Sequence, residues 1–334
     1  MVGNISKGSG FIWNAIKILL AIALVWFIYS KTNLSDISEL FKNVSVNWLV
    51  VSFLFFCLMT MMKAVQYYML SGRQTLYARV LSIVVVQNVV TNFIAAGAGI
   101  ASYLTMFHVD ESVRLRKAAA TFIIAKIGDL VAVWCILSVA GVILWNQITV
   151  LRIAVIVMLA IIPLAIGILL LVIVVRQKFL KVVDALLNGI GLGHFTIIQR
   201  GLDALQYLAE QKASVVFRIL LTAVACSLVY MALTMLWILS NLLAYSMIIP
   251  AAVVVFVSSW IQLISWIPIQ VFGGLGVMET SQVYLYGLFG IPAVQMATVS
   301  VGLRVSLYLF NLISLLYIPL NTFLRRRESP LQSS

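Results

Sequence analysis

The chain has 334 residues, of which 63% are hydrophobic and only 10% are charged, and its mean hydropathy is +1.12. This composition excludes a soluble globular domain, which needs far more charged surface. The net charge of +12 does not indicate a nucleic-acid partner, because the basic residues lie in short loops between apolar runs, where Lys and Arg record topology and contact anionic headgroups. Long apolar runs without short alternating segments predict an all-α polytopic membrane protein.

The first half of the chain, residues 1–175, contains four predicted membrane spans and one interrupted apolar run. No small-residue cleavage site follows the first span, so we expect a retained helix and not a signal peptide. The interrupted run at 80–107 contains Gly97 and Gly99. The predicted spans cover residues 11–30, 48–70, 118–144 and 151–175.

A polar stretch at 176–214 separates this half from the second half, residues 215–334, within what we expect to be a single membrane domain. Its apolar stripes predict two cytoplasmic amphipathic helices joined by a flexible, glycine-rich segment. In the second half, spans are predicted at 215–240 and 293–320. A second glycine-interrupted region, residues 243–290, lies between them.

The distribution of basic residues tests how these segments cross the membrane. If every apolar run crossed once, the Arg325–Arg327 tail would lie opposite the basic loop at 108–117 and the basic stretch at 176–214, which the positive-inside rule disfavours. If each interrupted region is instead a hairpin that returns to its own side, fifteen basic residues share one face and three, Lys31, Lys42 and Arg152, lie on the other. We therefore predict six full spans and two membrane-embedded helical hairpins, with both termini cytoplasmic in the inner membrane.

This topology makes the two interrupted regions an inverted repeat. One hairpin enters from the cytoplasm and the other from outside, so that broken helices meet near the midplane, as in secondary transporters. Glycines suit hairpin tips because they tolerate positive φ and close backbone approach, and the helix arm after a tip exposes N–H groups to anions. The alternative is that the glycines only allow helices to pack closely. The glycines concerned are Gly97, Gly99, Gly273, Gly274 and Gly276.

Charged side chains within the apolar runs are the candidate site residues, because each costs about 2.5–3.5 kcal/mol at mid-span unless it finds a partner or a wet cavity. Lys126 and Asp129 share a helix face and either neutralise each other or line a site. Arg304 has no acid within helical reach, so we expect Glu279 as its partner; Glu279 alternatively caps its own helix. Lys63 either joins the site or extends to the interface. In the functional interpretation, Arg304 grips a phosphate through two hydrogen bonds and Lys126 adds a second cationic point.

These residues resemble a known family. Pro268, the run Gly273-Gly-Leu-Gly-Val-Met-Glu279, Gly290-Ile291 and Arg304 are similar to the signature of the lysylphosphatidylglycerol synthase transmembrane, flippase-like family. The segment Gly97–Ser102 with Lys126 and Asp129 resembles its first-half motif. There the family usually has a proline and an acid around the glycine, and often an arginine later. This chain has alanines, Ser102 and Lys126 at those places.

The resemblance implies translocation of a phospholipid or lipid-linked intermediate across the cytoplasmic membrane, with anionic or phosphate-bearing lipids as partners. Some members carry a soluble aminoacyltransferase domain. This chain stops at Ser334, soon after its last predicted span, so we expect no such domain and no aminoacylation.

Two other classes of function stay open. One is a non-transporting partner of a lipid-modifying enzyme or glycosyltransferase, which would dock on 176–214, although such a stretch also suits headgroup binding. The other is a membrane enzyme, which would need a cluster of His, Asp or Glu near the interface. His108 and His194 lie in separate stretches without metal-ligand spacing, and we expect the three cysteines to be packing residues. We therefore predict no catalytic residues, no metal and no cofactor.

Overall fold

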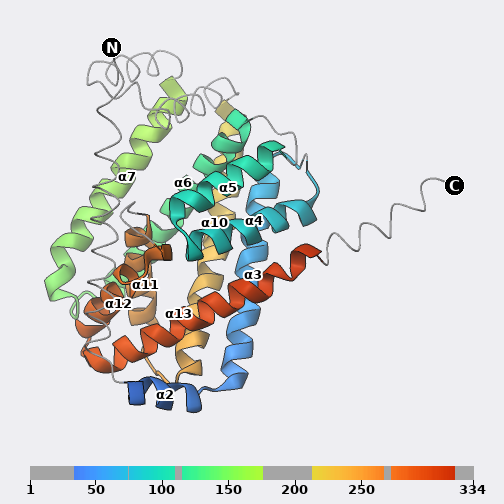
Figure 1. Ribbon diagram of the computed structural model, residues 1–334. Coiled ribbons are helices and arrows are strands. Elements are labelled where there is room, and N and C mark those ends of the chain that lie inside the picture. Colours follow the sequence, from blue (N-terminus) through green and yellow to red (C-terminus); the bar gives the residue numbers. More distant parts are fainter. Residues whose placement is uncertain (1–33, 74, 110–114, 176–212, 267–271, 320–334) are drawn as a thin grey trace, which may run out of the picture. The chain divides into compact units, whose positions relative to one another are not determined.

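The computed structural model describes residues 34–73, 75–109, 115–175, 213–266 and 272–319 (Figure 1). These residues form helices and no strand, which confirms the all-α class. The predicted span at 11–30, most of the 176–214 stretch and the Arg325–Arg327 tail lie outside the described residues.

The chain packs as two compact units, and each unit draws on both halves of the sequence. The first unit contains Met1–Phe56, Val85–Ala101 and Met235–Ser334. The second contains Cys57–Val84 and Ser102–Thr234. The predicted halves follow chain order, whereas the units follow packing, so helices α3, α4, α5 and α10 each contribute residues to both units.

Four helices of the described residues are long and apolar enough to cross a membrane, judged by length and composition. They coincide with predicted spans, and their cores are α3 (Val46–Leu70), α6 (Leu115–Ile143), α10 (Ala213–Ala244) and α13 (Ala293–Leu315). The predicted span at 151–175 is also helical, as α7 (Arg152–Val175), and Pro163 lies inside it. The total of six spans stays a prediction.

The exposed surface of these helices is apolar in the way that lipid contact requires. Val142 in α6 is 72% exposed, Ile153 in α7 is 77% exposed, and Leu54 in α3 is 56% exposed. In water, contiguous exposed apolar side chains of this size would drive aggregation. In hydrocarbon they carry no such penalty, and the backbone groups beneath them are paired within the helices. The protein is therefore a multi-pass membrane protein.

The first interrupted run folds as two helices, α4 (Tyr77–Phe93) and α5 (Ala96–Val109). The sequence had led us to expect the break at Gly97 and Gly99. It falls instead at residues 94–95. At the break, the amide of Ala95 donates to the carbonyl of Val90, and the carbonyl of Ala95 then accepts from Gly99 to begin α5. Gly97 and Gly99 lie inside α5 without positive φ.

The second interrupted region contains α11 (Ala251–Ser265), a 3-10 turn η2 (Phe272–Gly274) and α12 (Val277–Gly287). Here the glycines do form the break. Gly273, Gly274 and Gly276 have φ values of 66°, 80° and 85°, in the left-handed region that favours glycine. Helix α12 packs against both α11 and α13 (Figure 1). The ring of Phe256 in α11 lies 5.8 Å from that of Phe289, in the turn after α12.

A short amphipathic helix, α2 (Leu34–Lys42), lies between the predicted spans at 11–30 and 48–70. It packs on α13, where Gly302 leaves room for Leu40. The ring of Phe41 meets that of Tyr245 edge-on at 6.3 Å. Tyr245 in turn donates to the carbonyl of Gly302 at 2.7 Å. The helix therefore covers the contact between the end of α10 and α13.

Candidate functional site

Arg304 reaches from α13 to the broken segment between α11 and α12. Its guanidinium lies 2.5 Å from the Glu279 carboxylate, through Nη2 and Oε1. Its Nη1 donates to the carbonyl oxygen of Gly273 at 2.9 Å. The two charged side chains are only 11% and 7% exposed. The guanidinium therefore joins a buried carboxylate to a carbonyl of the irregular segment.

Glu279 has two roles at once, and these were the two alternatives left open by the sequence. One carboxylate oxygen accepts from Arg304, while the other accepts from the backbone amide of Gly276 at 2.7 Å. Because a helix N-terminus has amides without helical partners, this second bond stabilises the start of α12. Glu279 is thus both the ion-pair partner and the cap.

Gly273 also lies directly against the end of α4. A side-chain carbon built at Gly273 would stand 1.8 Å from the carbonyl oxygen of Asn92 and 2.5 Å from its carbonyl carbon. Only a residue without a side chain fits there, which explains the first glycine of the motif. The tips of the two interrupted regions are therefore in backbone contact within the first unit.

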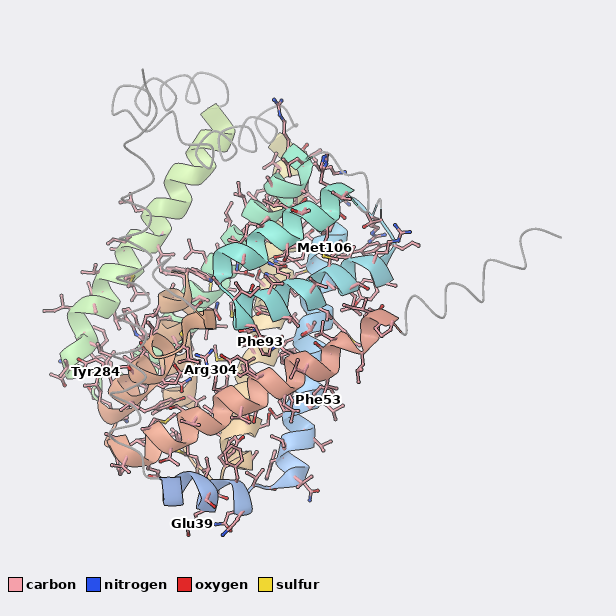
Figure 2. The ribbon with its side chains drawn as sticks, in the orientation of Figure 1. Glu39, Phe53, Phe93, Met106, Tyr284 and Arg304 are labelled. Atoms are coloured by element: carbon pink, nitrogen blue, oxygen red, sulfur yellow. The ribbon has the colours of Figure 1, made fainter. Side chains whose placement is uncertain are left out.

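An aromatic pair continues this contact. Phe93, the last residue of α4, stacks on Tyr308 of α13 with 4.7 Å between ring centroids and 27° between ring planes. The Arg304 guanidinium lies 5.7 Å from the Tyr308 ring centroid, a cation–π distance. Figure 2 labels Phe93 and Arg304 among the side chains of the first unit.

We call these six residues the tip junction: Asn92, Phe93, Gly273, Glu279, Arg304 and Tyr308. It contains one cation and one anion, so its formal charges balance. The guanidinium could bind a phosphate, because its planar donors match two phosphate oxygens. A phosphate bound there would displace contacts of the guanidinium or lie directly beside them, because Nε, Nη1 and Nη2 each already make one.

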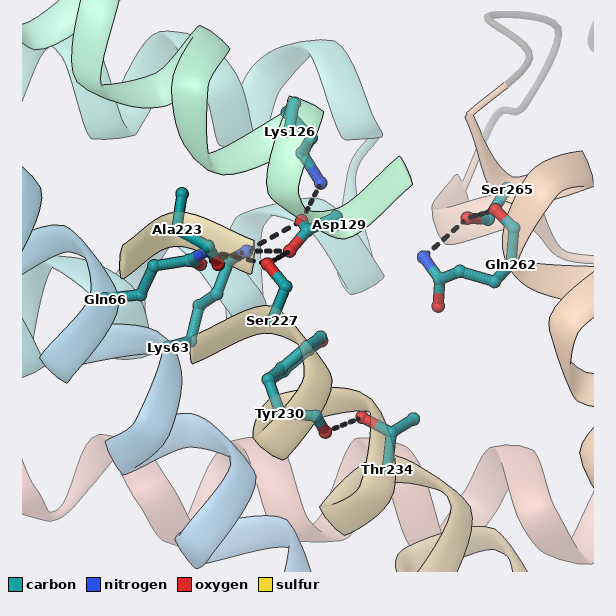
Figure 3. Close-up of polar contacts among 10 residues, drawn as sticks. All are labelled: Lys63, Gln66, Lys126, Asp129, Ala223, Ser227, Tyr230, Thr234, Gln262 and Ser265. Carbon is teal, nitrogen blue, oxygen red and sulfur yellow. Dashed lines mark hydrogen bonds and ion pairs between the residues drawn. The ribbon is translucent and has the colours of Figure 1, made fainter. Parts of the chain in front are cut away.

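A second buried cluster lies in the second unit and is centred on Asp129 of α6 (Figure 3). Lys63 of α3 contacts both carboxylate oxygens, at 2.8 and 2.7 Å. Lys126 contacts one of them at 3.3 Å and is 39% exposed at its side chain. Ser227 of α10 donates to Asp129 at 2.8 Å. Asp129 therefore has four polar contacts, and Lys63, not Lys126, is its nearer cationic partner.

Lys63 lies inside the cluster, and its side chain is 10% exposed. Its ammonium donates to Gln66 at 2.8 Å and stands 5.3 and 5.0 Å from the ring centroids of Tyr67 and Tyr230. Gln66 then donates to Ser227 at 2.7 Å and to the carbonyl of Ala223 at 3.1 Å. Side chains of three helices thus form one hydrogen-bonded network (Figure 3).

The close approach of α6 to α10 depends on Gly128. A side-chain carbon at this position would lie 2.8 Å from the backbone of Ala223. Without that approach Ser227 could not reach Asp129. The sequence placed Gly128 beside the acid, but nothing in the local pattern showed which helix it would face.

Of the predicted site residues, the structure brings together Arg304, Glu279 and Gly273, and separately Lys63, Lys126 and Asp129. Gly276 lies at the cap of α12, and Gly274 is buried in the turn before it. Gly99 instead packs on α4, where an added carbon would meet the Thr91 side chain at 1.9 Å. Gly97 has no atom within 4 Å of such a carbon. That Lys126 and Arg304 line one cavity stays a prediction.

Sequence reasoning missed Asn92, Phe93 and Tyr308 in the tip junction and Gln66 and Ser227 around Asp129. A signal existed for two of these. Gln66 follows Lys63 by three residues and Tyr308 follows Arg304 by four, the spacings at which helical side chains meet. The others come from different helices and leave no local pattern. Within the described ranges, no group of three His, Cys, Asp or Glu side chains could hold a metal ion.

The helices and their buried ion pairs define an α-helical, multi-pass membrane protein with a broken helix beside a buried arginine. Residues 14–314 match the family described as the lysylphosphatidylglycerol synthase TM region. The chain belongs to that family, which indicates a membrane protein of lipid metabolism or transport. No curated protein and no solved structure matches the chain.

Proposed function

We propose that the protein translocates a phospholipid or lipid-linked intermediate across the cytoplasmic membrane, and that Arg304 binds the phosphate of that lipid. The observation that carries this proposal is the position of Arg304. It lies in an apolar chain, beside a helix break, with its guanidinium on an irregular backbone segment. Irregular backbone at membrane depth is tolerated where it is buried in protein or lines a polar path. Buried charges in membrane helices are most often functional.

The acceptors around Arg304 support an exchangeable site more than a purely structural pair. The hydrogen bond from Gly276 uses the second oxygen of Glu279, Oε2, and does not involve the guanidinium. A phosphate could therefore replace the carboxylate at the guanidinium without leaving Glu279 unpartnered. The lipid would be anionic or phosphate-bearing, and the termini would be cytoplasmic, as the basic residues predict.

The test is transport of a fluorescent phosphatidylglycerol by the purified full chain in liposomes, normalised to inserted protein. Arg304→Lys keeps the charge but loses the planar two-pronged donor, so we expect it to lose most transport. A charged hydrogen bond contributes about 1.5–3 kcal/mol, so Arg304→Ala should weaken lipid binding roughly ten- to a hundredfold. Arg152→Lys is the matched control, because Arg152 lies outside the tip junction and donates to the carbonyl of Trp145.

The Arg304→Ala/Glu279→Gln double variant separates binding from simple neutralisation. If the two residues only neutralise each other, the double variant should recover transport, because no buried charge is left unpaired. If Arg304 binds the lipid, the double variant stays inactive while it still inserts. No lipid movement by the wild-type protein would favour the alternative, a non-transporting partner of a lipid-modifying enzyme.

A further inference from the structure

The tip junction contains more than an anion site, because it also joins the two broken helices to each other. We propose that it is a latch: an anionic phosphate group that takes the Arg304 guanidinium separates the tip at Gly273 from the end of α4 at Asn92. This inference rests on the proposed function for the identity of the anion, and it adds how binding would be converted into movement.

The first step is competition for the donors of Arg304. A phosphate bound by a fork of two hydrogen bonds needs two neighbouring N–H groups, either Nε with Nη2 or Nη1 with Nη2. In the structure Nε and Nη2 face Glu279, and Nη1 donates to the Gly273 carbonyl. A phosphate on the Nε–Nη2 fork must displace the Glu279 carboxylate, which occupies it. On the Nη1–Nη2 fork each nitrogen has a second N–H group. A phosphate bound there lies beside the carboxylate and the Gly273 carbonyl oxygen and repels both.

The second step is the release of the glycine turn. Gly273 is held by the Arg304 hydrogen bond on one side and rests on the Asn92 carbonyl on the other. The turn lies outside regular α-helix, so few backbone bonds oppose its movement. The cap from Glu279 to Gly276 does not involve the guanidinium and keeps the start of α12 in place. The movement is thus confined to the turn and does not unwind the helix.

The third step links the guanidinium to the first tip. Arg304 lies over Tyr308, and Tyr308 stacks on Phe93 at the end of α4. A shift of the guanidinium toward a phosphate changes the contact that orients this ring pair. Phe93 and the next residue, Ile94, are 36% and 57% exposed, so the end of α4 has room to move. Tyr308 and Phe93 are therefore positioning residues of the latch.

The experiment measures the distance between spin labels on the two tips by electron paramagnetic resonance. The labels replace Ile94 and Leu275 in the full chain, after the three free cysteines at 57, 135 and 226 are changed to alanine. The protein is held in an uncharged maltoside detergent, which contains no phosphate. The probes are short-chain phosphatidylglycerol, inorganic phosphate and, as the uncharged control, short-chain diacylglycerol. Lipid binding is measured on the same sample by native mass spectrometry.

We expect phosphatidylglycerol to produce a second, longer distance and diacylglycerol to leave the distance unchanged. If the phosphate group alone operates the latch, inorganic phosphate will also produce the longer distance between the labels. If the lipid is required, inorganic phosphate will leave that distance unchanged. Arg304→Gln should show the longer distance without any lipid and should not respond to it. Gly273→Ala should also show the longer distance without lipid, because its side chain pushes on Asn92, while it still binds phosphatidylglycerol.

Two results would overturn the latch, and they differ in what they say about the proposed function. If phosphatidylglycerol binds in an Arg304-dependent manner and the distance does not change, the latch is wrong and the lipid site stands. If phosphatidylglycerol does not bind the wild-type protein, both ideas are wrong. If Arg304→Gln fails to fold, the lipid titration of the wild-type protein and the Gly273→Ala variant still show whether phosphate binding separates the two tips.

Discussion

The two buried ion clusters use similar residues in different ways. Around Asp129, side chains from three regular helices contact one another, and Gln66 also donates to the carbonyl of Ala223. Around Arg304, both charged side chains contact the backbone of a broken helix. A carboxylate that joins regular helices stabilises their packing. A carboxylate that holds an irregular turn instead fixes a segment whose backbone conformation can change. We therefore propose that the first cluster serves stability and the second binds the lipid.

The largest expected effect is on Asp129, because its loss leaves Lys63 buried without its carboxylate. Asp129→Leu should destabilise the protein by about 3–5 kcal/mol, measured by thermal unfolding in detergent. The Lys63→Leu/Asp129→Leu double variant should return to near wild-type stability or exceed it, since apolar replacements of a buried pair are often neutral or stabilising. A double variant as unstable as Asp129→Leu would show that the cluster does more than join the helices.

Glu279→Gln should cost less than Asp129→Leu. The glutamine keeps an oxygen that can accept from Gly276, and Arg304 keeps the Gly273 carbonyl, but the guanidinium loses the charged contact that Nε and Nη2 make with the carboxylate. We expect about 1.5–3 kcal/mol, together with faster hydrogen exchange at the first amides of α12. Unchanged exchange at those amides would contradict the capping role and reduce the contrast between the two clusters.

Gly273→Ala and Gly97→Ala compare the two glycine motifs directly. Gly273 has positive φ and touches the Asn92 backbone, so alanine should cost about 1–3 kcal/mol and impair transport. Gly97 lies within α5 with open space around it, so alanine there should be neutral or stabilise by up to about 1 kcal/mol. Equal effects at both positions would mean that the two motifs are equivalent after all.

The smallest effect is expected at Lys126. It is the more exposed of the two lysines, and Asp129 keeps Lys63 and Ser227 when it is removed. Lys126→Gln should therefore change stability by about 0.5 kcal/mol or less, the usual contribution of a helical pair at this spacing. If Lys126→Gln folds normally and abolishes transport, Lys126 belongs to the lipid path, and the assignment of its cluster to stability alone is wrong.

The sequence by itself determined the class of protein, four of the helices that can span a membrane, and the second helix break. These follow from composition and from local backbone chemistry: long apolar runs predict helices in lipid, and Gly273, Gly274 and Gly276 favour a turn. It also indicated the partner of Arg304, because α13 offers no acid within helical reach and Glu279 is the charged residue of the adjacent motif.

Only the tertiary structure decided which cation pairs most closely with Asp129, where the first break falls and what the first glycines do. Helical spacing identifies neighbours three or four residues apart, so it indicated Lys126, whereas Lys63 comes from another helix. Likewise, Gly97 and Gly99 look like a hairpin tip in the sequence, but the chain turns at residues 94–95, and Gly99 serves to let α5 approach Thr91. Contacts between helices depend on how whole faces pack, and that information is distributed over segments far apart in the chain.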